Sequence, residues 1–507
     1  MRNAIEFVGH TLPLVLAALA ASAVPVVNAQ ASDLDLDVGF GSAGLVVADY
    51  TNAQGSYDIG FRAFRECNKT TGGQCQFPVG YHYWVAGYHN HYSTQDAIVS
   101  LVSDAGVPVP SFGSSGNLTV ATNLTRINDV AFDPATERLY FVGSEKFIST
   151  DTQFSVFCLD LTTAASCAGF GNTHSTGIDS EMVYFNLGGS DNDEATRVLF
   201  DPQGFLYVAG TADSASGYQL AVTKLSASTG APISAFGNSG KASYEMGNAA
   251  PKLSVGVYGM ALIPSSHQGI SLDKLYLATA INNQYGNKVG LVVMLDAEGG
   301  GYIAGHAIYY VADDPVGGHG DDYLTAITVL ANGELAVAGY STTTTANQPA
   351  LLIAKLHADS SLALDSNFCN GGICVKPVGA NPHGWHNTYP IAIAERPENR
   401  DLVLGMQADT YNYNFSTSQY VLSQKQVVQQ YGASGDVLHA STEILFPAFD
   451  AATLSVRSFG MAADDGSVVL VGSRGFTTSS LDYDVTVARL LANDSIFANQ
   501  FGGAASD

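Results

Sequence analysis

The chain has 507 residues, of which only 13% are charged, while 53 are glycine and 46% are hydrophobic. This composition excludes an intrinsically disordered protein, because disordered chains are rich in charge and poor in apolar side chains. The formal net charge of −25 opposes binding to polyanions, so we expect no nucleic acid and no anionic membrane surface as a partner.

The first 29 residues have the pattern of a secretory signal peptide. One basic residue, Arg2, precedes the apolar run 11–24, and Val27-Asn28-Ala29 matches a small-x-small cleavage site. We therefore expect residues 1–29 to be removed and residues 30–507 to form a secreted, periplasmic or cell-surface protein. No later apolar run reaches the roughly 18 residues that a spanning helix needs, so the mature chain is not expected to cross a membrane.

A repeat of about 66 residues organises the mature chain. Seven short β-type runs, most of them ending in glycine, recur at spacings of 56 to 69 residues. They are Trp84-Val-Ala-Gly87, Tyr140-Phe-Val-Gly143, Tyr207-Val-Ala-Gly210, Tyr276-Leu-Ala-Thr279, Ala336-Val-Ala-Gly339, Leu402-Val-Leu-Gly405 and Val469-Leu-Val-Gly472. A fixed period indicates a repeat architecture and overrides the three or four domains that length alone suggests.

Each repeat contains four strand-like segments separated by turns. In the third copy they are 196–200, 205–209, 219–225 and 240–244, and the first turn is Asp201-Pro-Gln-Gly204. Four-stranded antiparallel units repeated around an axis predict an all-β protein, a single-domain β-propeller with seven blades. We expect the segment Phe40–Ala48 to supply the missing fourth strand of the last blade and so close the ring. A ring of eight blades is the alternative.

A second landmark, Phe-x-x-x-Gly, begins at Phe40, Phe112, Phe236 and Phe368. Together with Leu206–Gly210 and Leu220–Leu225, it resembles the bacterial delta-60 repeat, whose consensus combines a V-A-G strand, an A-x-x-R-Y/L strand and L-D-x-x-F-G-x-x-G. The resemblance spans residues 34–503. It implies an exported bacterial protein with a propeller scaffold, and it implies no shared catalytic residues.

The six cysteines fall into three close pairs: Cys67 with Cys75, Cys158 with Cys167, and Cys369 with Cys374. Such short separations favour three local disulfides, which are typical of exported proteins. A metal site is the alternative, although no Cys-x-x-Cys spacing is present.

Acidic residues recur before or within the first strand of successive repeats. They are Asp58, Asp129, Asp193, Glu194, Asp321 and Asp322, joined by His386 of the sixth repeat. If these residues converge at one mouth of the ring, their oxygen ligands suit Ca²⁺, and closely spaced carboxylates suit acid–base chemistry. The alternative is that each aspartate caps its own loop.

Two further groups are candidates for binding. His89, His91 and Asp96 lie close together in the chain and carry the donor atoms that Zn²⁺ or Cu²⁺ prefers, although such histidines also bond to the main chain. Tyr411 and Tyr413 belong to a segment rich in tyrosine and asparagine, which is typical of sugar or protein recognition. Packing between blades is the alternative role for these tyrosines.

We found no sequence motif for catalysis. The sequence therefore favours a secreted, monomeric binding module that recognises a glycan, a peptide or a protein through its loop face. One alternative is an extracellular hydrolase or lyase that uses acidic and histidine residues at the tunnel mouth. Another is a structural component of the cell envelope. No cofactor other than Ca²⁺ is expected.

Overall fold

The computed structural model describes most of the chain between Leu34 and Leu491. The described residues are 34–50, 57–67, 81–91, 94–122, 124–148, 151–171, 182–187, 192–214, 217–246, 256–265, 273–282, 287–308, 320–342, 349–369, 371–377, 387–396, 399–414, 419–438, 442–444, 453–464, 467–478 and 480–491. They form strands and turns, and no membrane-spanning helix is found among them.

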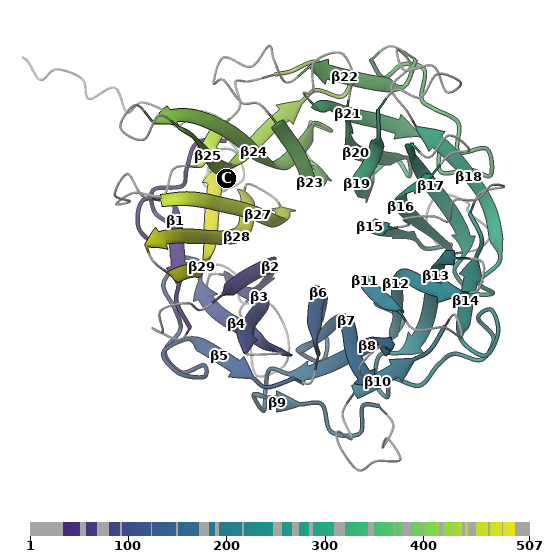
Figure 1. Cartoon of the computed structure of the whole chain (residues 1–507), viewed down its shortest axis with the longest axis horizontal. Helices are drawn as coiled ribbons and strands as arrows, with labels where there is room; N and C mark the ends of the chain where they lie inside the picture. The colour runs from purple at the N-terminus through teal and green to yellow at the C-terminus, as the bar shows by residue number, and fades with distance from the viewer. Residues whose placement is uncertain are drawn as a thin grey trace, which may run out of the picture.

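Seven antiparallel sheets stand around a central axis as the blades of a β-propeller (Figure 1). Blade 1 consists of β2 (Asp58–Cys67), β3 (Tyr81–His91), β4 (Thr94–Ser103) and β5 (Asn117–Val120). Blade 2 consists of β6 (Arg126–Asp133), β7 (Arg138–Ile148), β8 (Asp151–Asp160) and β10 (Met182–Phe185), with the short β9 (Ala165–Ser166) also paired to β8. Blade 3 consists of β11 (Glu194–Asp201), β12 (Phe205–Ser214), β13 (Gly217–Ser226) and β14 (Lys241–Tyr244).

The remaining blades continue around the ring in chain order. Blade 4 consists of β15 (Gly256–Ile263), β16 (Lys274–Asn282), β17 (Lys288–Asp296) and β18 (Tyr302–Ile308). Blade 5 consists of β19 (Asp322–Val329), β20 (Leu335–Thr342), β21 (Pro349–Leu356) and β22 (Ile373–Pro377). Blade 6 consists of β23 (Asn387–Glu395), β24 (Leu402–Asn414), β25 (Gln419–Tyr431) and β26 (Thr442–Ile444). The first strand of each blade lies nearest the axis (Figure 1).

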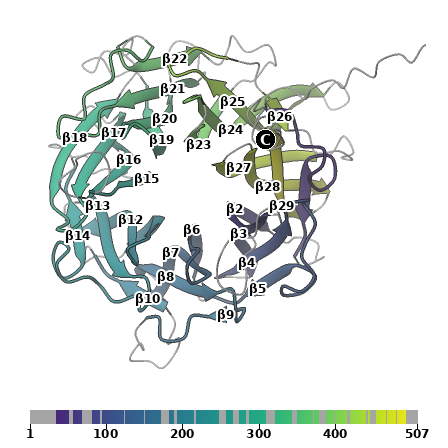
Figure 2. The same cartoon turned by 180° about the vertical axis from the view of Figure 1, so that it is seen from behind.

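The ring closes through the N-terminal segment. Blade 7 is built from β27 (Thr453–Asp464), β28 (Ser467–Thr478) and β29 (Ser480–Leu491), as Figure 2 shows from behind, and its outer strand is β1 (Leu45–Ala48), labelled in Figure 1. Strand β1 pairs antiparallel with β29, with Leu45 opposite Ala488 and Ala48 opposite Val485. The predicted seven-bladed ring and its closing strand are thus confirmed, and eight blades are excluded.

The core lies between neighbouring blades, because alternate residues of a strand point to opposite faces of its sheet. On β12, Leu206 and Val208 pack with the buried side chains of blade 2. The intervening Tyr207 and Ala209 instead pack with Leu275 and its neighbours in blade 4. Each blade is therefore buried on both faces, which accounts for the apolar runs and the low charge of the sequence.

The tyrosine of the repeat motif forms a hydrogen bond from one blade to the next. Its hydroxyl donates to the main-chain carbonyl that follows the third strand of the neighbouring blade. The three pairs are Tyr140 with Ala227 at 2.9 Å, Tyr207 with Ala297 at 2.9 Å, and Tyr276 with Ala358 at 2.7 Å. The recurrence of tyrosine in the sequence thus reflects a bond between blades.

The basic residue of the third strand makes a second link between blades. The Nζ atom of Lys224 donates to the carbonyl of Ala297 at 3.0 Å, and Lys355 contacts Ala433 in the same way at 3.0 Å. Both links run from one blade to the next and are largely removed from solvent. They strengthen the ring at the end opposite the loops that enter each blade.

The Phe-x-x-x-Gly landmark is a turn with a buried ring. In each copy the glycine N–H donates to the phenylalanine carbonyl at 2.8 to 2.9 Å. These glycines have φ angles of 89° to 96°, a region that a residue with a side chain rarely adopts. The four glycines are Gly44, Gly116, Gly240 and Gly372.

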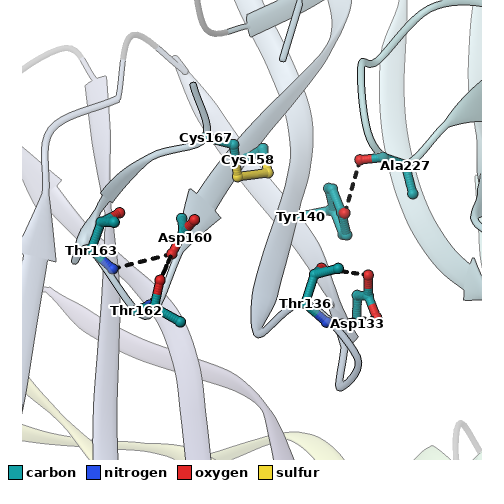
Figure 3. The surroundings of a disulfide bond; sticks show 9 residues. All are labelled: Asp133, Thr136, Tyr140, Cys158, Asp160, Thr162, Thr163, Cys167 and Ala227. Carbon is teal, nitrogen blue, oxygen red and sulfur yellow. Dashed lines mark hydrogen bonds between the residues drawn. A yellow bond between two sulfur atoms is a disulfide. The ribbon is translucent and has the colours of Figure 1, made fainter. Parts of the chain in front are cut away.

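Two of the expected disulfides, Cys158–Cys167 and Cys369–Cys374, are confirmed. In the first disulfide, Cys158 lies near the end of β8 and Cys167 directly follows β9, so the bond lies within blade 2 (Figure 3). The hydrogen bond from Tyr140 of the same blade to Ala227 lies nearby. Cys67 is also disulfide-bonded, and Cys75 lies outside the described residues.

Candidate ligand site in the central cavity

A β-bulge interrupts the innermost strand of every blade. At each bulge, one residue of that strand has no partner opposite it in the second strand. The seven bulge residues are Phe61, Asn128, Thr196, Tyr258, Thr325, Ile391 and Phe459. Because a bulge redirects the side chains beside it, these positions form a ring of irregular backbone around the axis.

The glycine of the V-A-G motif makes room for this bulge. A Cβ atom on Gly87 would lie 1.8 Å from the carbonyl oxygen of Ile59, and one on Gly210 would lie 2.0 Å from that of Glu194. Blade 4 has Thr279 at this position, and its hydroxyl donates to the equivalent carbonyl, that of Gly256, at 2.6 Å. In blades 1, 2, 3 and 5 the motif glycine is therefore what allows the two innermost strands to approach so closely.

Polar bulge residues also join each blade to the next. Asn128 donates from Nδ2 to the carbonyl of Ala195 at 2.8 Å. The hydroxyl of Thr196 donates to the carbonyl of Val257 at 2.8 Å, and that of Thr325 donates to Pro390 at 2.6 Å. In all three cases the acceptor directly precedes the bulge of the next blade, so the same contact recurs around the axis.

A cavity of about 420 Å³ lies at the centre of the ring, and residues from all seven blades line it. Its two sides differ in chemistry because of the residue that follows each bulge. In blades 1 to 3 this residue is charged: Arg62, Asp129 and Arg197. In blades 4 to 6 it is small: Gly259, Ala326 and Ala392. The small residues leave space opposite a charged wall.

Within the charged wall, Arg62 and Asp129 form a two-point ion pair. The Nε atom of Arg62 lies 2.9 Å from Oδ1 of Asp129, and Nη2 lies 3.2 Å from Oδ2. The Oδ2 atom also accepts the N–H of Val198 at 3.3 Å. The charge of Asp129 raises the pKa of Arg62. This carboxylate therefore connects the innermost strands of blades 1, 2 and 3.

Arg197 is held in a different way. Its Nε donates to the carbonyl of Tyr258 at 2.6 Å, and Nη1 donates to the carbonyl of Thr196 at 2.6 Å. Within the described part of the chain, no carboxylate lies within ion-pair distance of this guanidinium. Burial lowers the pKa of Arg197, yet a guanidinium keeps its charge at any physiological pH. The cavity thus contains a fixed positive charge without a carboxylate partner.

Tyrosines line the cavity beside the small residues. Tyr258, Tyr340 and Tyr389 contribute to the lining, and the ring of Tyr340 lies 5.0 Å from that of Tyr389. Tyr323 stacks behind Tyr340 at 4.9 Å. Burial raises the pKa of Tyr323 to about 12 and also raises the pKa of Tyr258 and Tyr340. These phenols stay protonated at neutral pH.

Among the candidate acids, Asp129 lines the cavity, whereas three others form hydrogen bonds to main-chain N–H groups at the ends of strands. Oδ2 of Asp193 accepts from Leu187 at 2.5 Å and Oδ1 accepts from Asp213 at 3.0 Å. Asp58 accepts the N–H of Tyr50, and Asp321 accepts that of Lys288. Glu194 pairs instead with Arg126 and Asn128, both at 2.9 Å. These contacts fit the capping role that was the alternative.

Of the remaining candidates, the structure describes the side chain of Asp322, which is not among the residues that line the cavity. Asp322 is buried at the start of β19. His386 lies outside the described residues, and the structure describes only the backbone of Tyr411 and Tyr413, on β24.

The histidine group is described in part. Nδ1 of His89 lies 2.6 Å from Oδ1 of Asp58, and Asp96 sits opposite His89 in the neighbouring strand. The side chain of His91 is not among those described. Within the described residues there is no group of three or more histidine, cysteine, aspartate or glutamate side chains that could hold a metal ion.

Sequence reasoning missed Arg62 and Arg197. A usable signal exists, because the bulge residue lies 13 to 15 positions before the motif glycine in repeats with a short first turn, as Thr196 lies before Gly210. In blades 1 to 6 the residue after the bulge lines the cavity, together with most of the bulge residues themselves. In blade 1 a longer first turn hides this spacing for Arg62.

No family model matches the chain, and no curated protein matches it in sequence. Similar solved structures include the polysaccharide lyase Uly1, which is 10% identical with a TM-score of 0.45 over 87% of this chain and 100% of that chain. Drosophila Semaphorin 1b, extracellular domains 1–2, is 9% identical with a TM-score of 0.39 over 86% of each chain. A protein of unknown function from Dyadobacter fermentans is 9% identical with a TM-score of 0.38 over 89% of this chain and 100% of that chain. At such low identities these likenesses say nothing about the activity of this chain.

Proposed function

We propose that this protein is an extracytoplasmic binding module whose ligand, an acidic saccharide, enters the central cavity. The observation that carries the proposal is Arg197, a guanidinium that lines the cavity and donates its two hydrogen bonds to main-chain carbonyls. A guanidinium has five N–H donors. The donors that remain can meet a carboxylate in the two-point arrangement that arginine favours.

The local charge supports an anionic ligand in spite of the charge of the whole chain. The formal net charge of the chain is −25. The charged residues in the cavity lining, in contrast, are two arginines and one aspartate, with a net charge of +1. A positively charged cavity inside an acidic protein attracts anions only at short range. Such a site favours a small acidic ligand over a large polyanion, which the outer surface repels.

The opposite wall supports a sugar ring. Tyrosines present flat apolar faces together with hydroxyl groups, a combination that suits polar rings. Tyr258, Tyr340 and Tyr389 stand near the small residues Gly259 and Ala326, so a ring has space beside them. A volume of about 420 Å³ lies within the usual range for small-molecule sites.

The predicted signal peptide, the disulfides and the resemblance to delta-60 repeats support a location outside the cytoplasm. In this proposal the ligand binds in the cavity at the axis of the ring, and it enters from the loop face. This differs from the loop-face recognition expected at first.

The proposal is tested by calorimetric titration of the mature protein with D-glucuronate and with D-glucose. We expect binding of glucuronate only, and its loss in Arg197→Gln. Arg400→Gln is the matched control, because it removes the same charge from an exposed turn between β23 and β24. Equal binding by wild type and Arg197→Gln would contradict the proposal.

A further inference from the structure

The carboxylate of Asp129 lies between the two arginines of the cavity. It pairs with Arg62 through both oxygens, and its charge also acts on the guanidinium of Arg197. We propose that Asp129 is a specificity-determining residue that limits the central cavity to ligands with one negative charge. This inference rests on the proposed function.

The argument begins with the charge of the wall. Two guanidinium groups and one carboxylate leave a single net positive charge. In a partly desolvated site, charges that remain without compensation are costly. A ligand with one negative charge neutralises the wall, whereas a ligand with two leaves an excess negative charge among Asp129 and the tyrosine hydroxyls. The site therefore favours a carboxylate over a phosphate monoester.

Asp129 cannot avoid the ligand by moving, because three hydrogen bonds hold its carboxylate. Its side chain is only 3% exposed. Both oxygens contact Arg62, and Oδ2 also accepts the N–H of Val198. The negative charge of Asp129 thus has a fixed place in the wall, and it repels any anionic ligand in the cavity.

The same contacts give the two arginines different roles. Arg62 uses Nε and Nη2 for Asp129, and this carboxylate neutralises its charge. Arg197 uses Nε and one Nη1 proton for main-chain carbonyls, which leaves protons on both Nη atoms. The charge of Arg197 therefore remains without a carboxylate partner among the described residues and is available for one carboxylate of a ligand.

Asp129 also links three blades, so a test must separate its charge from its structural contacts. The readout is the ratio of the affinity for glucose 6-phosphate, a dianion at pH 8, to the affinity for glucuronate, a monoanion. A purely structural role would change both affinities together or lower the stability of the protein. Only a charge role changes their ratio in a direction set by the net charge of the wall.

The experiment compares wild type with Asp129→Asn, which keeps the shape of the side chain and removes its charge. We expect the ratio to rise at least about tenfold, which corresponds to about 1.4 kcal/mol. The double variant Arg62→Gln/Asp129→Asn restores one net positive charge, and it should return the ratio to within about threefold of wild type. Asp129→Ser, which removes the charge with a smaller polar side chain, replaces Asp129→Asn if the latter does not fold.

The outcomes separate the two proposals. A ratio that is unchanged in Asp129→Asn and Asp129→Ser, while glucuronate still binds and Arg197→Gln abolishes binding, overturns the role of Asp129 alone. Unaltered glucuronate binding by Arg197→Gln overturns the proposed site itself, and with it this inference.

Discussion

Arg489 of the last blade contacts Asp104 of the first blade, with 2.8 Å between Nη1 and Oδ1. The same guanidinium lies 2.8 Å from Asp37 through Nε and covers the ring of Phe40. One side chain therefore joins blade 7, blade 1 and the N-terminal segment that closes the ring. The propeller holds its seam with charge-assisted hydrogen bonds as well as with the strand pair of β1 and β29.

Replacing Arg489 should weaken the seam. Its side chain is only 12% exposed, and hydrogen bonds to charged groups contribute about 1.5–3 kcal/mol. We expect Arg489→Met to lower the free energy of unfolding by about that amount, measured by chemical denaturation. Arg400→Gln, which removes an exposed arginine, should leave it nearly unchanged. Equal effects of the two variants would argue against a seam held by Arg489.

The motif glycine of the third blade provides a test of the bulge. In Gly210→Ala the new Cβ would lie 2.0 Å from the carbonyl oxygen of Glu194, so the innermost strand must shift. We expect a loss of about 1–3 kcal/mol, the usual cost of overpacking, seen as a lower thermal midpoint. Gly301→Ala is the control, because a Cβ there meets no atom within 4 Å. A midpoint unchanged by Gly210→Ala would refute the steric explanation of the motif.

The pair of His89 and Asp58 predicts a pH-dependent contribution to stability. The hydrogen bond to Asp58, together with the charges of Asp58 and Asp96, raises the pKa of His89 above its ordinary value of 6.5. A raised pKa in the folded state means that the charged form stabilises the fold fully below pH 6.5 and less as the pH rises through the folded pKa. We expect His89→Gln to be more destabilising at pH 5.5 than at pH 9.

Denaturation curves of wild type and His89→Gln at both pH values provide the measurement. His306 has a pKa that burial lowers, so His306→Gln should show no such excess loss at low pH. If His89→Gln cost the same free energy at pH 5.5 and pH 9, the charged pair would not contribute.

The disulfide of blade 2 should contribute through the unfolded chain. Cys158 and Cys167 are both fully buried and close a short loop. For a loop of about ten residues, the entropy model gives about 2.5–3 kcal/mol. We expect the double replacement by alanine to lower the free energy of unfolding by that order. Treatment of the double variant with a reductant then reports the contribution of the remaining disulfides.

Much of the fold could be predicted because it is local and repeated. The run Tyr207-Val-Ala-Gly210, its turn and its neighbouring strands recur with a nearly constant period, and a four-stranded unit of that kind can bury its faces only against copies of itself. The same reasoning predicted that residues 40–48 complete the last blade, since the last repeat ends before its fourth strand.

The candidate site was predicted poorly for a physical reason. Carboxylates such as Asp193 stand out in the sequence, yet the structure shows their oxygens accepting main-chain N–H groups. Their purpose depends on which amide groups lie nearby, and the spacing of residues does not report this. Arg62 and Arg197 belong to no functional motif, and only their distance from the motif glycine marks their positions in the sequence.

The sequence by itself determined the all-β class, the number of repeats, the closing strand and the two local disulfides that the structure describes, because each depends on residues close in the chain or on a periodic pattern. Only the tertiary structure decided that Arg62, Asp129 and Arg197 share one wall. These residues lie about one repeat apart in the chain, and ring closure brings equivalent positions of successive repeats around a common axis. Charges that are separated in the sequence thereby become neighbours in the wall of one cavity.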